Sequence, residues 1–288
     1  MQHPGSVGRM GVFAALLLAL TLGACATRPT DPEDLAHFKE INDPLEPMNR
    51  AFFQFNEAAD KVVLRPLAIG YRAVVPRGLR SGIRNFLDNL ETPVILLNDL
   101  LQGEGVRARD TVGRFMTNTI LGLGGMIDVA SDAGIAYHDE DFGQTLAVWG
   151  VAPGPYLVLP LFGPTGVRDA VGDGVDGAID PVGYYIRDEY GLEGAAVRYT
   201  LDTVDWRAAN LQIIDDLRRS SIDFYAATRS AYRQQRNNEI RNGRINPDDP
   251  GGLPPMIEFD AMDNIGERGV DDSQNPQPQQ QQEPAPAP

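Results

Sequence analysis

Three short motifs contain residue types that could bind phosphate or a metal ion. The segment from Gly172 to Gly177 fits the G-x-G-x-x-G spacing of dinucleotide-binding loops, and the triplet from Asp141 to Gly143 matches the D-F-G of protein kinases. Four carboxylates that could attract calcium lie close by in the sequence, at Asp169, Asp173, Asp176 and Asp180.

None of these motifs has the neighbours that its chemistry requires. No clear strand precedes Gly172, and Asp173 and Asp176 would repel a pyrophosphate. The D-F-G triplet has neither an H-R-D segment nor a P-loop with it, and the four aspartates miss the spacing of an EF-hand loop. We interpret the aspartates as a solvated acidic turn and predict no metal and no cofactor.

The sequence also offers little for covalent or acid–base catalysis. It contains neither G-x-S-x-G nor H-E-x-x-H, and only His37 and His138 follow the N-terminal apolar segment. His138 stands among acidic residues, which indicates an imidazole paired with a carboxylate at the surface. We predict that the protein is not an enzyme; a lipid hydrolase is the alternative. A net charge of −15, from 25 basic and 40 acidic residues, argues against nucleic acid as a partner.

The single cysteine indicates where the protein resides. Cys25 follows an apolar run from Val12 to Leu22 that is too short to cross a bilayer, and small residues lead into it. This is the pattern of a bacterial lipobox, in which the signal is removed and the cysteine is acylated. Residue 26 is alanine rather than aspartate, which favours sorting to the periplasmic leaflet of the outer membrane.

The chain divides into four predicted parts. Residues 1–24 are a lipoprotein signal peptide, residues 25–41 a lipidated tether and residues 42–245 the folded domain. Residues 246–288 hold nine of the 22 prolines and carry a net charge of −8, so this acidic Pro/Gln-rich tail is predicted to be disordered.

The domain is predicted to be mainly α and a single domain. Asp43 as N-cap, Pro44 at the first helical position and Glu46 at the third predict a helix start. An apolar stripe from Met48 to Val62 predicts a helix that Pro66 ends. Leu79 to Leu90 repeat the pattern, and Thr92-Pro93 is expected to begin a new helix. Further helices are predicted over 106–119 and 197–217, with an ion pair between Asp215 and Arg219.

Several segments are unusually apolar for a soluble protein. The helix from Val94 to Leu101 has almost no polar face, and the Pro/Gly-broken stretch 150–163 permits a short extended piece at Tyr156–Leu159. Either these helices form an ordinary core or, because Cys25 holds the domain against a bilayer, they lie in that leaflet. Gly122, Gly124 and Gly125 suit either close helix packing or a flexible loop.

A family resemblance runs through the domain in a constant order. Its signature helix contains Asn49, Arg50, Phe52, Phe55 and Asn56, and later segments include 113–119, 121–130, 141–146 and 154–160. Over residues 43–235 the chain resembles the VacJ/MlaA family of outer-membrane lipoproteins. The acidic tail and a longer charged turn near Arg187–Glu193 depart from the family pattern.

The resemblance implies a ring-like helical domain in one leaflet, with an amphipathic central channel. It implies removal of mislocalised phospholipid from the outer leaflet, association with a trimeric porin and transfer to a periplasmic shuttle of the MlaC type. A lipoprotein scaffold that transports nothing is the alternative. The candidate headgroup or channel residues are Arg80, Arg84, Arg107, Arg109 and Arg114, each of which could equally pair with a structural carboxylate. Candidate gating or close-packing residues are Gly122, Gly124, Gly125, Gly154 and Pro155.

Overall fold

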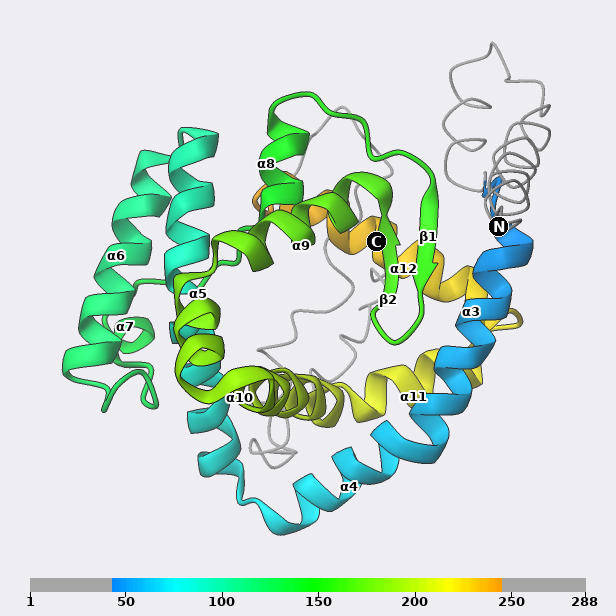
Figure 1. The fold of residues 1–288 in the computed structure, drawn as a ribbon, viewed down its shortest axis with the longest axis horizontal. Helices are drawn as coiled ribbons and strands as arrows, with labels where there is room; N and C mark the ends of the chain where they lie inside the picture. The colour runs from blue at the N-terminus through cyan, green and yellow to red at the C-terminus, as the bar shows by residue number, and fades with distance from the viewer. Residues whose placement is uncertain (1–42, 245–288) are drawn as a thin grey trace, which may run out of the picture. The chain divides into compact units, whose positions relative to one another are not determined.

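The computed structural model of the protein describes residues 43–244 (Figure 1). These residues belong to one compact unit, in agreement with a single domain. The signal peptide, Cys25, the tether and the tail lie outside the described residues, so the predictions for them remain predictions.

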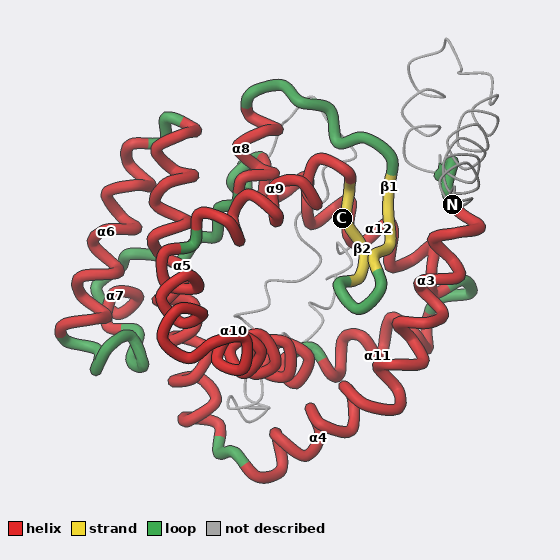
Figure 2. Tube along the Cα trace, viewed as in Figure 1, coloured by secondary structure: helices red, strands yellow, loops and turns green. Residues whose placement is uncertain are grey.

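The described chain is mainly helical, with two short strands (Figure 2). Its elements are α3 (Glu46–Ala59), the π-helix η1 (Asp60–Leu64), α4 (Arg65–Val74), α5 (Arg77–Gln102), α6 (Gly105–Ile120), α7 (Val129–Asp132), α8 (Phe142–Val148), β1 (Tyr156–Leu159), β2 (Gly163–Gly166), α9 (Val167–Ile179), α10 (Pro181–Ala209), α11 (Leu211–Ser220) and α12 (Phe224–Ile240). Across residues 43–244, no helix combines the length and the apolar character needed to cross a membrane.

The helix boundaries predicted at Pro66 and at Pro93 are wrong. The π-turn of η1 shifts the register just before Pro66, so the proline falls in the first turn of α4, where a missing N–H is tolerated. Pro93 lies inside the continuous helix α5. Leu87 and Asn89 are buried before this proline and Ile95 and Asn98 after it, so tertiary packing on both sides holds α5 together.

The extended piece predicted at Tyr156–Leu159 is strand β1. It pairs with β2 in antiparallel register, from Tyr156 opposite Gly166 to Leu159 opposite Gly163. The hairpin leads directly into α9, so the G-x-G-x-x-G segment lies within a helix and not in a phosphate-binding loop.

The C-terminal third differs from the prediction in detail. Helix α10 is broken at Gly191, whose φ is +67°, and a second break at Asn210 separates it from α11. Asp215 pairs with Arg65 and Arg218, whereas Arg219 pairs with Asp216, so the predicted pair of Asp215 and Arg219 is wrong. Helix α12, which the sequence pattern did not separate, closes the domain.

Contacts between the elements follow a closed order, as expected of a ring-like domain. Helix α3 contacts β1, β2 contacts α9, and α9 contacts α10. Helix α10 in turn contacts α4, which η1 joins back to α3. Helices α5 and α6 pack side by side next to this circuit, and α12 contacts α8, β2 and α11 (Figure 1).

The burial pattern is the reverse of that of a typical soluble domain. Among residues 43–244, 11 hydrophobic and 15 polar or charged side chains are buried. The predicted stripe on α3 faces outward at Phe55, which is 52% exposed, and on α6 an outward stripe is formed by Val112, Met116 and Ile120. The stripe on α3 was predicted at the right spacing and that on α6 was not predicted; on both helices apolar side chains face outward, and polar groups join the elements.

Candidate functional site

Two asparagines of α3 bind the backbone of β1 and of the turn that follows it. The side chain of Asn49 donates to the carbonyl oxygen of Tyr156 (2.9 Å) and accepts from the amide of Val158 (3.0 Å). Two helical turns later, Asn56 donates to the oxygen of Leu159 (2.9 Å) and accepts from the amide of Leu161 (2.7 Å). Residues seven apart share one helix face, so the side-chain amides of Asn49 and Asn56 point the same way. Each pairs with one backbone oxygen and one backbone amide, as the backbone of a neighbouring strand would.

Arg50 connects α3 to the start of α12. Its guanidinium binds Asp223 through Nη1 (3.2 Å) and Nη2 (2.6 Å) and lies 4.4 Å from the ring centre of Tyr225. The hydrogen bonds from Arg50 hold the pKa of Asp223 below its usual value. Asp223 also caps α12 by accepting from the amide of Ala226 (3.2 Å), so Arg50 fixes where that helix begins.

Asp43 joins α3 and α12 through a side chain that is fully buried. Its carboxylate accepts from Asn49 (2.9 Å) and from the hydroxyl of Tyr225, and it lies 3.4 Å from Arg229. The predicted N-cap role is wrong: α3 begins at Glu46, and Asp43 binds the amide of Leu45 just before the helix. Asp43 therefore ties the start of α3 to α12.

Two aromatic residues of the signature helix pack inside the domain, and a third faces its surroundings. Phe52 and Phe53 pack against a buried cluster of Tyr156, Val158 and Tyr225. Phe55 points outward with Met48. The signature helix thus holds the hairpin and α12 with one face and presents apolar side chains to the surroundings with another.

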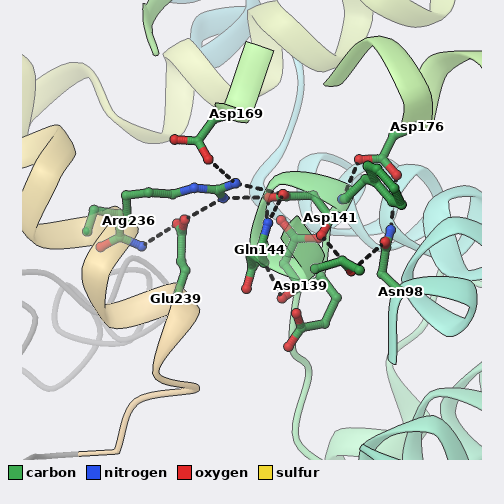
Figure 3. Close-up of polar contacts among 12 residues, drawn as sticks. Asn98, Asp139, Asp141, Gln144, Asp169, Asp176, Arg236 and Glu239 are labelled. Carbon is green, nitrogen blue, oxygen red and sulfur yellow. Dashed lines mark hydrogen bonds and ion pairs between the residues drawn. The ribbon is translucent and has the colours of Figure 1, made fainter. Parts of the chain in front are cut away.

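A second polar network joins α5, α8, α9 and α12 (Figure 3). Arg236 binds Asp141 (Nη2 to Oδ1, 2.7 Å), Asp169 (3.0 Å) and Glu239 (3.1 Å). Asp176 accepts from Asn98 (3.0 Å) and from the amide of Phe142 (2.7 Å).

Asp141 also has a second task in this network. It caps α8 by accepting from the amide of Gln144 (2.8 Å). Burial is the largest single influence and would raise the pKa of Asp141, but the hydrogen bonds and charge of Arg236 together with the hydrogen bonds from Gln144 outweigh it, so the pKa lies below its usual value.

The motifs that looked like phosphate or metal sites are structural in this network. Gly143 and Gly172 lie where α8 crosses α9, and a Cβ on Gly172 would stand 2.3 Å from the amide nitrogen of Gly143. Asp169 is buried and bound by Arg168, Arg236 and Tyr232, so the prediction of a solvated turn is wrong. Among the described residues, no cluster of His, Cys, Asp or Glu has an arrangement suited to a metal ion.

Most of the candidate headgroup arginines bind carboxylates of the protein. Arg84 pairs with buried Asp205 (3.0 Å), Arg107 with buried Glu140, and Arg114 with Asp128 (2.8 Å). Arg109 is exposed and pairs with its neighbour Asp110 (2.9 Å). Arg80 is partly buried, and its Nε has no hydrogen-bond partner within residues 43–244. A role in lipid binding remains a prediction for all five.

The candidate glycines are positions that other residues would strain. A Cβ on Gly122 would lie 2.1 Å from the oxygen of Ile127, and one on Gly125 would lie 2.6 Å from Asn89. Gly124 and Gly125 adopt φ values of +74° and +98°. Residues 121–127 form a turn packed closely on α5, which favours close packing over a loose loop.

Gly154 and Pro155 connect the hairpin to α9. The oxygen of Pro155 accepts from the amide of Val167 (3.3 Å), and Gly154 has a φ of +69°. A Cβ on Gly154 would lie 3.1 Å from Val167, so this position is also closely packed. Gating by Gly154 or Pro155 remains a prediction.

Thr111, His138 and Asp99 resemble a catalytic triad in composition but not in the way their atoms are connected. Thr111 Oγ1 lies 3.0 Å from His138 Nε2 and 2.6 Å from Asp99 Oδ2. Asp99 also approaches the same Nε2 atom (3.2 Å), whereas a triad needs its carboxylate on Nδ1. His138 is paired with a carboxylate, as predicted, although this carboxylate is the fully buried Asp99 and the imidazole is largely buried too.

Comparison of the sequence with known protein families agrees with this geometry. A family model described as MlaA lipoprotein matches residues 41–239, which contain both polar networks. The chain belongs to the MlaA lipoprotein family. The resemblance seen in the sequence is thereby confirmed.

Individual relatives cover most of the chain. MlaA lipoproteins of Haemophilus influenzae and Escherichia coli K12, both named for an intermembrane phospholipid transport system, are each 36% identical, over 237 and 240 residues. The matches span 81% and 82% of this chain and 92% and 91% of theirs. An uncharacterised Rickettsia felis protein is 38% identical over 203 residues, which are 70% of this chain and 79% of its own.

A solved chain has the same fold. It comes from work on the structural basis for maintenance of bacterial outer membrane lipid asymmetry, and it matches with a TM-score of 0.62 at 37% identity. The match covers 69% of this chain and 99% of that chain. Within this MlaA-family domain, sequence reasoning gave Asp43, Asp141 and Asp169 other roles and missed Arg236 altogether. Helix α12, which carries Arg236, is rich in polar residues, so no local pattern singles this arginine out.

Proposed function

We propose that this protein is an envelope lipoprotein of the Gram-negative outer membrane that moves phospholipid between membranes. The observation that carries the proposal is the reversed burial pattern. Apolar stripes on α3, α5 and α6 face outward, while Asn, Asp and Arg side chains join the helices inside. Such faces are stable against acyl chains, and the membership in the MlaA family supports the same function.

The proposal places the domain within the leaflet to which the acylated Cys25 attaches it. Phospholipid that has strayed into the outer leaflet passes through the domain and is transferred to a soluble periplasmic shuttle, with a trimeric porin as membrane partner. The relatives named for an intermembrane phospholipid transport system support phospholipid transport itself. The protein moves the lipid without hydrolysing it.

Insertion depth can be measured on the lipidated protein. Acylation converts Cys25, the only cysteine of the chain, to a thioether, so a new cysteine can be labelled selectively. We expect a fluorophore at Met116→Cys, on the outward stripe of α6, to be quenched strongly by lipids with brominated acyl chains. A label at Asp216→Cys, an exposed polar position, should be quenched much less. Equal weak quenching at both positions would refute embedding.

Transport is tested by the lipids themselves. Deletion of the gene should raise the phospholipid exposed on the outer leaflet, and mass spectrometry of the purified lipidated protein should detect intact phospholipid. A scaffold predicts normal lipid exposure and no bound lipid. A hydrolase predicts lyso-lipid after incubation of the pure protein with phospholipid. Either result would replace the proposal.

A further inference from the structure

Helix α10 folds back on itself and forms a helical hairpin. At Gly191 the backbone has a φ of +67° and a ψ of −164°, which no regular helix adopts. Arg198 binds Asp180, 18 residues earlier in the chain, at 2.7 Å, and a Cβ on Gly194 would lie 3.2 Å from the side chain of Ile186. A straight helix would hold these two pairs about 27 Å and about 12 Å apart. The two parts of α10 therefore run antiparallel.

Residues 181–199, which we call the α10 hairpin, carry all the exposed tyrosines of the protein. Five of the nine tyrosines are buried or half-buried elsewhere in the domain. Leu192 and Val197 on the hairpin are also exposed, to 79% and 67%. The remaining four tyrosines lie on the hairpin and are between 49% and 68% exposed: Tyr184, Tyr185, Tyr190 and Tyr199.

The exposed rings and aliphatic groups do not form one flat face. Tyr184 and Tyr185 are adjacent in a helix, so they point about 100° apart. Tyr190 lies at the turn, and Leu192 and Val197 belong to the returning helix. A protein partner with a flat surface would cover one of these sides and leave the others in water. A medium that surrounds the end of the hairpin would cover all of them.

Charged side chains stand among these rings. Arg187, Asp188 and Glu189 are exposed and make no hydrogen bond or ion pair with any residue that the structure describes. Charges without partners are costly in hydrocarbon, which excludes the acyl core as the surroundings of the hairpin. A tyrosine ring is most stable where its apolar part meets acyl chains and its hydroxyl meets water. The headgroup layer of a membrane suits both kinds of side chain.

The length of the hairpin fits that layer. At a rise of about 1.5 Å per residue, Tyr184 and Tyr190 lie about 9 Å apart along the helix axis. A bilayer of about 40–45 Å has a hydrocarbon core of about 30 Å, so each headgroup layer is about 5–8 Å thick. The tyrosines are thus spread over roughly the depth of one headgroup layer.

We infer that the α10 hairpin is an interfacial anchor, whose tyrosines lie in the headgroup layer and set the depth of the domain in the membrane. The inference rests on the proposed function only in requiring that the domain lie in a leaflet. It gives a role to the charged turn near Arg187–Glu193, where the chain departs from the family pattern.

The test measures the depth of a spin label on the full lipidated protein. The protein carries the label at Glu189→Cys on the hairpin or at Met116→Cys on α6, and it is reconstituted in vesicles of phosphatidylethanolamine and phosphatidylglycerol. Collisions with oxygen and with a water-soluble nickel complex then give the distance of the label from the bilayer centre. We expect about 15–22 Å for the hairpin label and less than about 15 Å for the α6 label.

The decisive variant is Y184S/Y185S/Y190S, in which the hairpin label should move beyond about 22 Å, into water. Its matched control is Y184W/Y185W/Y190W, which keeps a ring with one polar group at each position and should keep the depth. All three tyrosines are exposed, so circular dichroism should show an unchanged fold. If the triple serine variant does not fold, Y184S/Y185S should still move the label outward.

The possible outcomes separate this inference from the proposed function. A hairpin label in water together with an α6 label in the core would overturn the anchor, leave transport intact and make a protein partner the occupant of the hairpin. An unchanged depth in the serine variant would overturn the role of the tyrosines. If the α6 label also lies in water, the domain does not lie in the bilayer, and the anchor and the proposed function fail together.

Discussion

Replacing Asn49 with alanine should destabilise the domain far more than its size suggests. The side chain is 0% exposed and makes hydrogen bonds of 2.9–3.0 Å to Asp43, to the oxygen of Tyr156 and to the amide of Val158. Tyr156 and Val158 are themselves buried, so water cannot replace the lost partner. Leaving a buried donor or acceptor unsatisfied costs about 1–3 kcal/mol, so the two backbone groups together give about 2–6 kcal/mol.

Asn56→Ala is the matched comparison on the same helix. It removes the same pair of hydrogen bonds, to Leu159 and Leu161, but Asn56 is only half-buried and Leu161 is 67% exposed. Water can take over these bonds, so the expected loss is about 1 kcal/mol. Urea unfolding in detergent micelles, followed by far-UV circular dichroism, gives both values from the shift in midpoint at unchanged slope.

Asn49→Asp separates hydrogen bonding from shape. The carboxylate can still accept from Val158, but it cannot donate to Tyr156 and it places a second negative charge beside Asp43. We expect N49D to be at least as unstable as N49A at pH 7 and to recover partly near pH 4, where protonation restores a donor. Equal losses for N49A and N56A, or an N49D protein as stable as the unmodified one, would refute this account of the signature helix.

Three further predictions concern the second polar network and the glycine turn. Arg236→Ala leaves largely buried Asp141 without its cation and Asp169 with Arg168 alone, and it should cost about 3–5 kcal/mol in urea unfolding. Arg219→Ala, at a 73% exposed position, should change stability by under about 0.5 kcal/mol. The pKa of Asp141 is lowered, so its contribution to stability is complete above about pH 4 and is lost as the pH falls through its folded-state pKa. An Asp141→Asn protein should therefore lose melting temperature less steeply as the pH is lowered below about 4. Gly122→Ala should destabilise the protein more than Gly124→Ala, because a Cβ on Gly122 would meet two backbone oxygens within 2.5 Å. A Cβ on Gly124 would meet open space, so this variant carries only the strain of its positive φ, about 1–2 kcal/mol. Equal melting temperatures of the two variants would contradict this prediction.

The positions of the helices were largely predictable because periodicity reports which residues share a face. The stripe of α3, the helix predicted over 106–119 (α6) and the short strand β1 are where the pattern placed them. Periodicity does not report which face meets solvent. In a soluble protein the stripe of Val112, Met116 and Ile120 would be core, and here it is exposed. The acylation pattern at Cys25 and the family resemblance indicated that the outer face could be the apolar one.

The two polar networks were much harder to predict, because their partners lie far apart in the chain. Asn49 meets Tyr156 across 107 residues, and Arg236 meets Asp141 across 95. A polar residue inside an apolar stripe, such as Asn49 or Asn98, indicates that a buried partner exists but cannot identify it. The same long-range contacts explain why Pro93 does not break α5, which local sequence rules alone would end there.

The reversed burial pattern also explains why the domain depends on directional polar contacts. When the apolar faces of α3, α4 and α6 point outward, burial of nonpolar surface between helices cannot alone fix which neighbour each helix takes. Hydrogen bonds and ion pairs specify both partner and register, and here they join α3 to β1 through Asn49, α3 to α12 through Arg50, and α12 to α8 and α9 through Arg236. Because each of these contacts has a single geometry, their loss should disconnect particular neighbours and not merely loosen a general core. The proposed passage of lipid through the domain requires such fixed neighbours, since a helix free to shift would fill the passage with its own side chains.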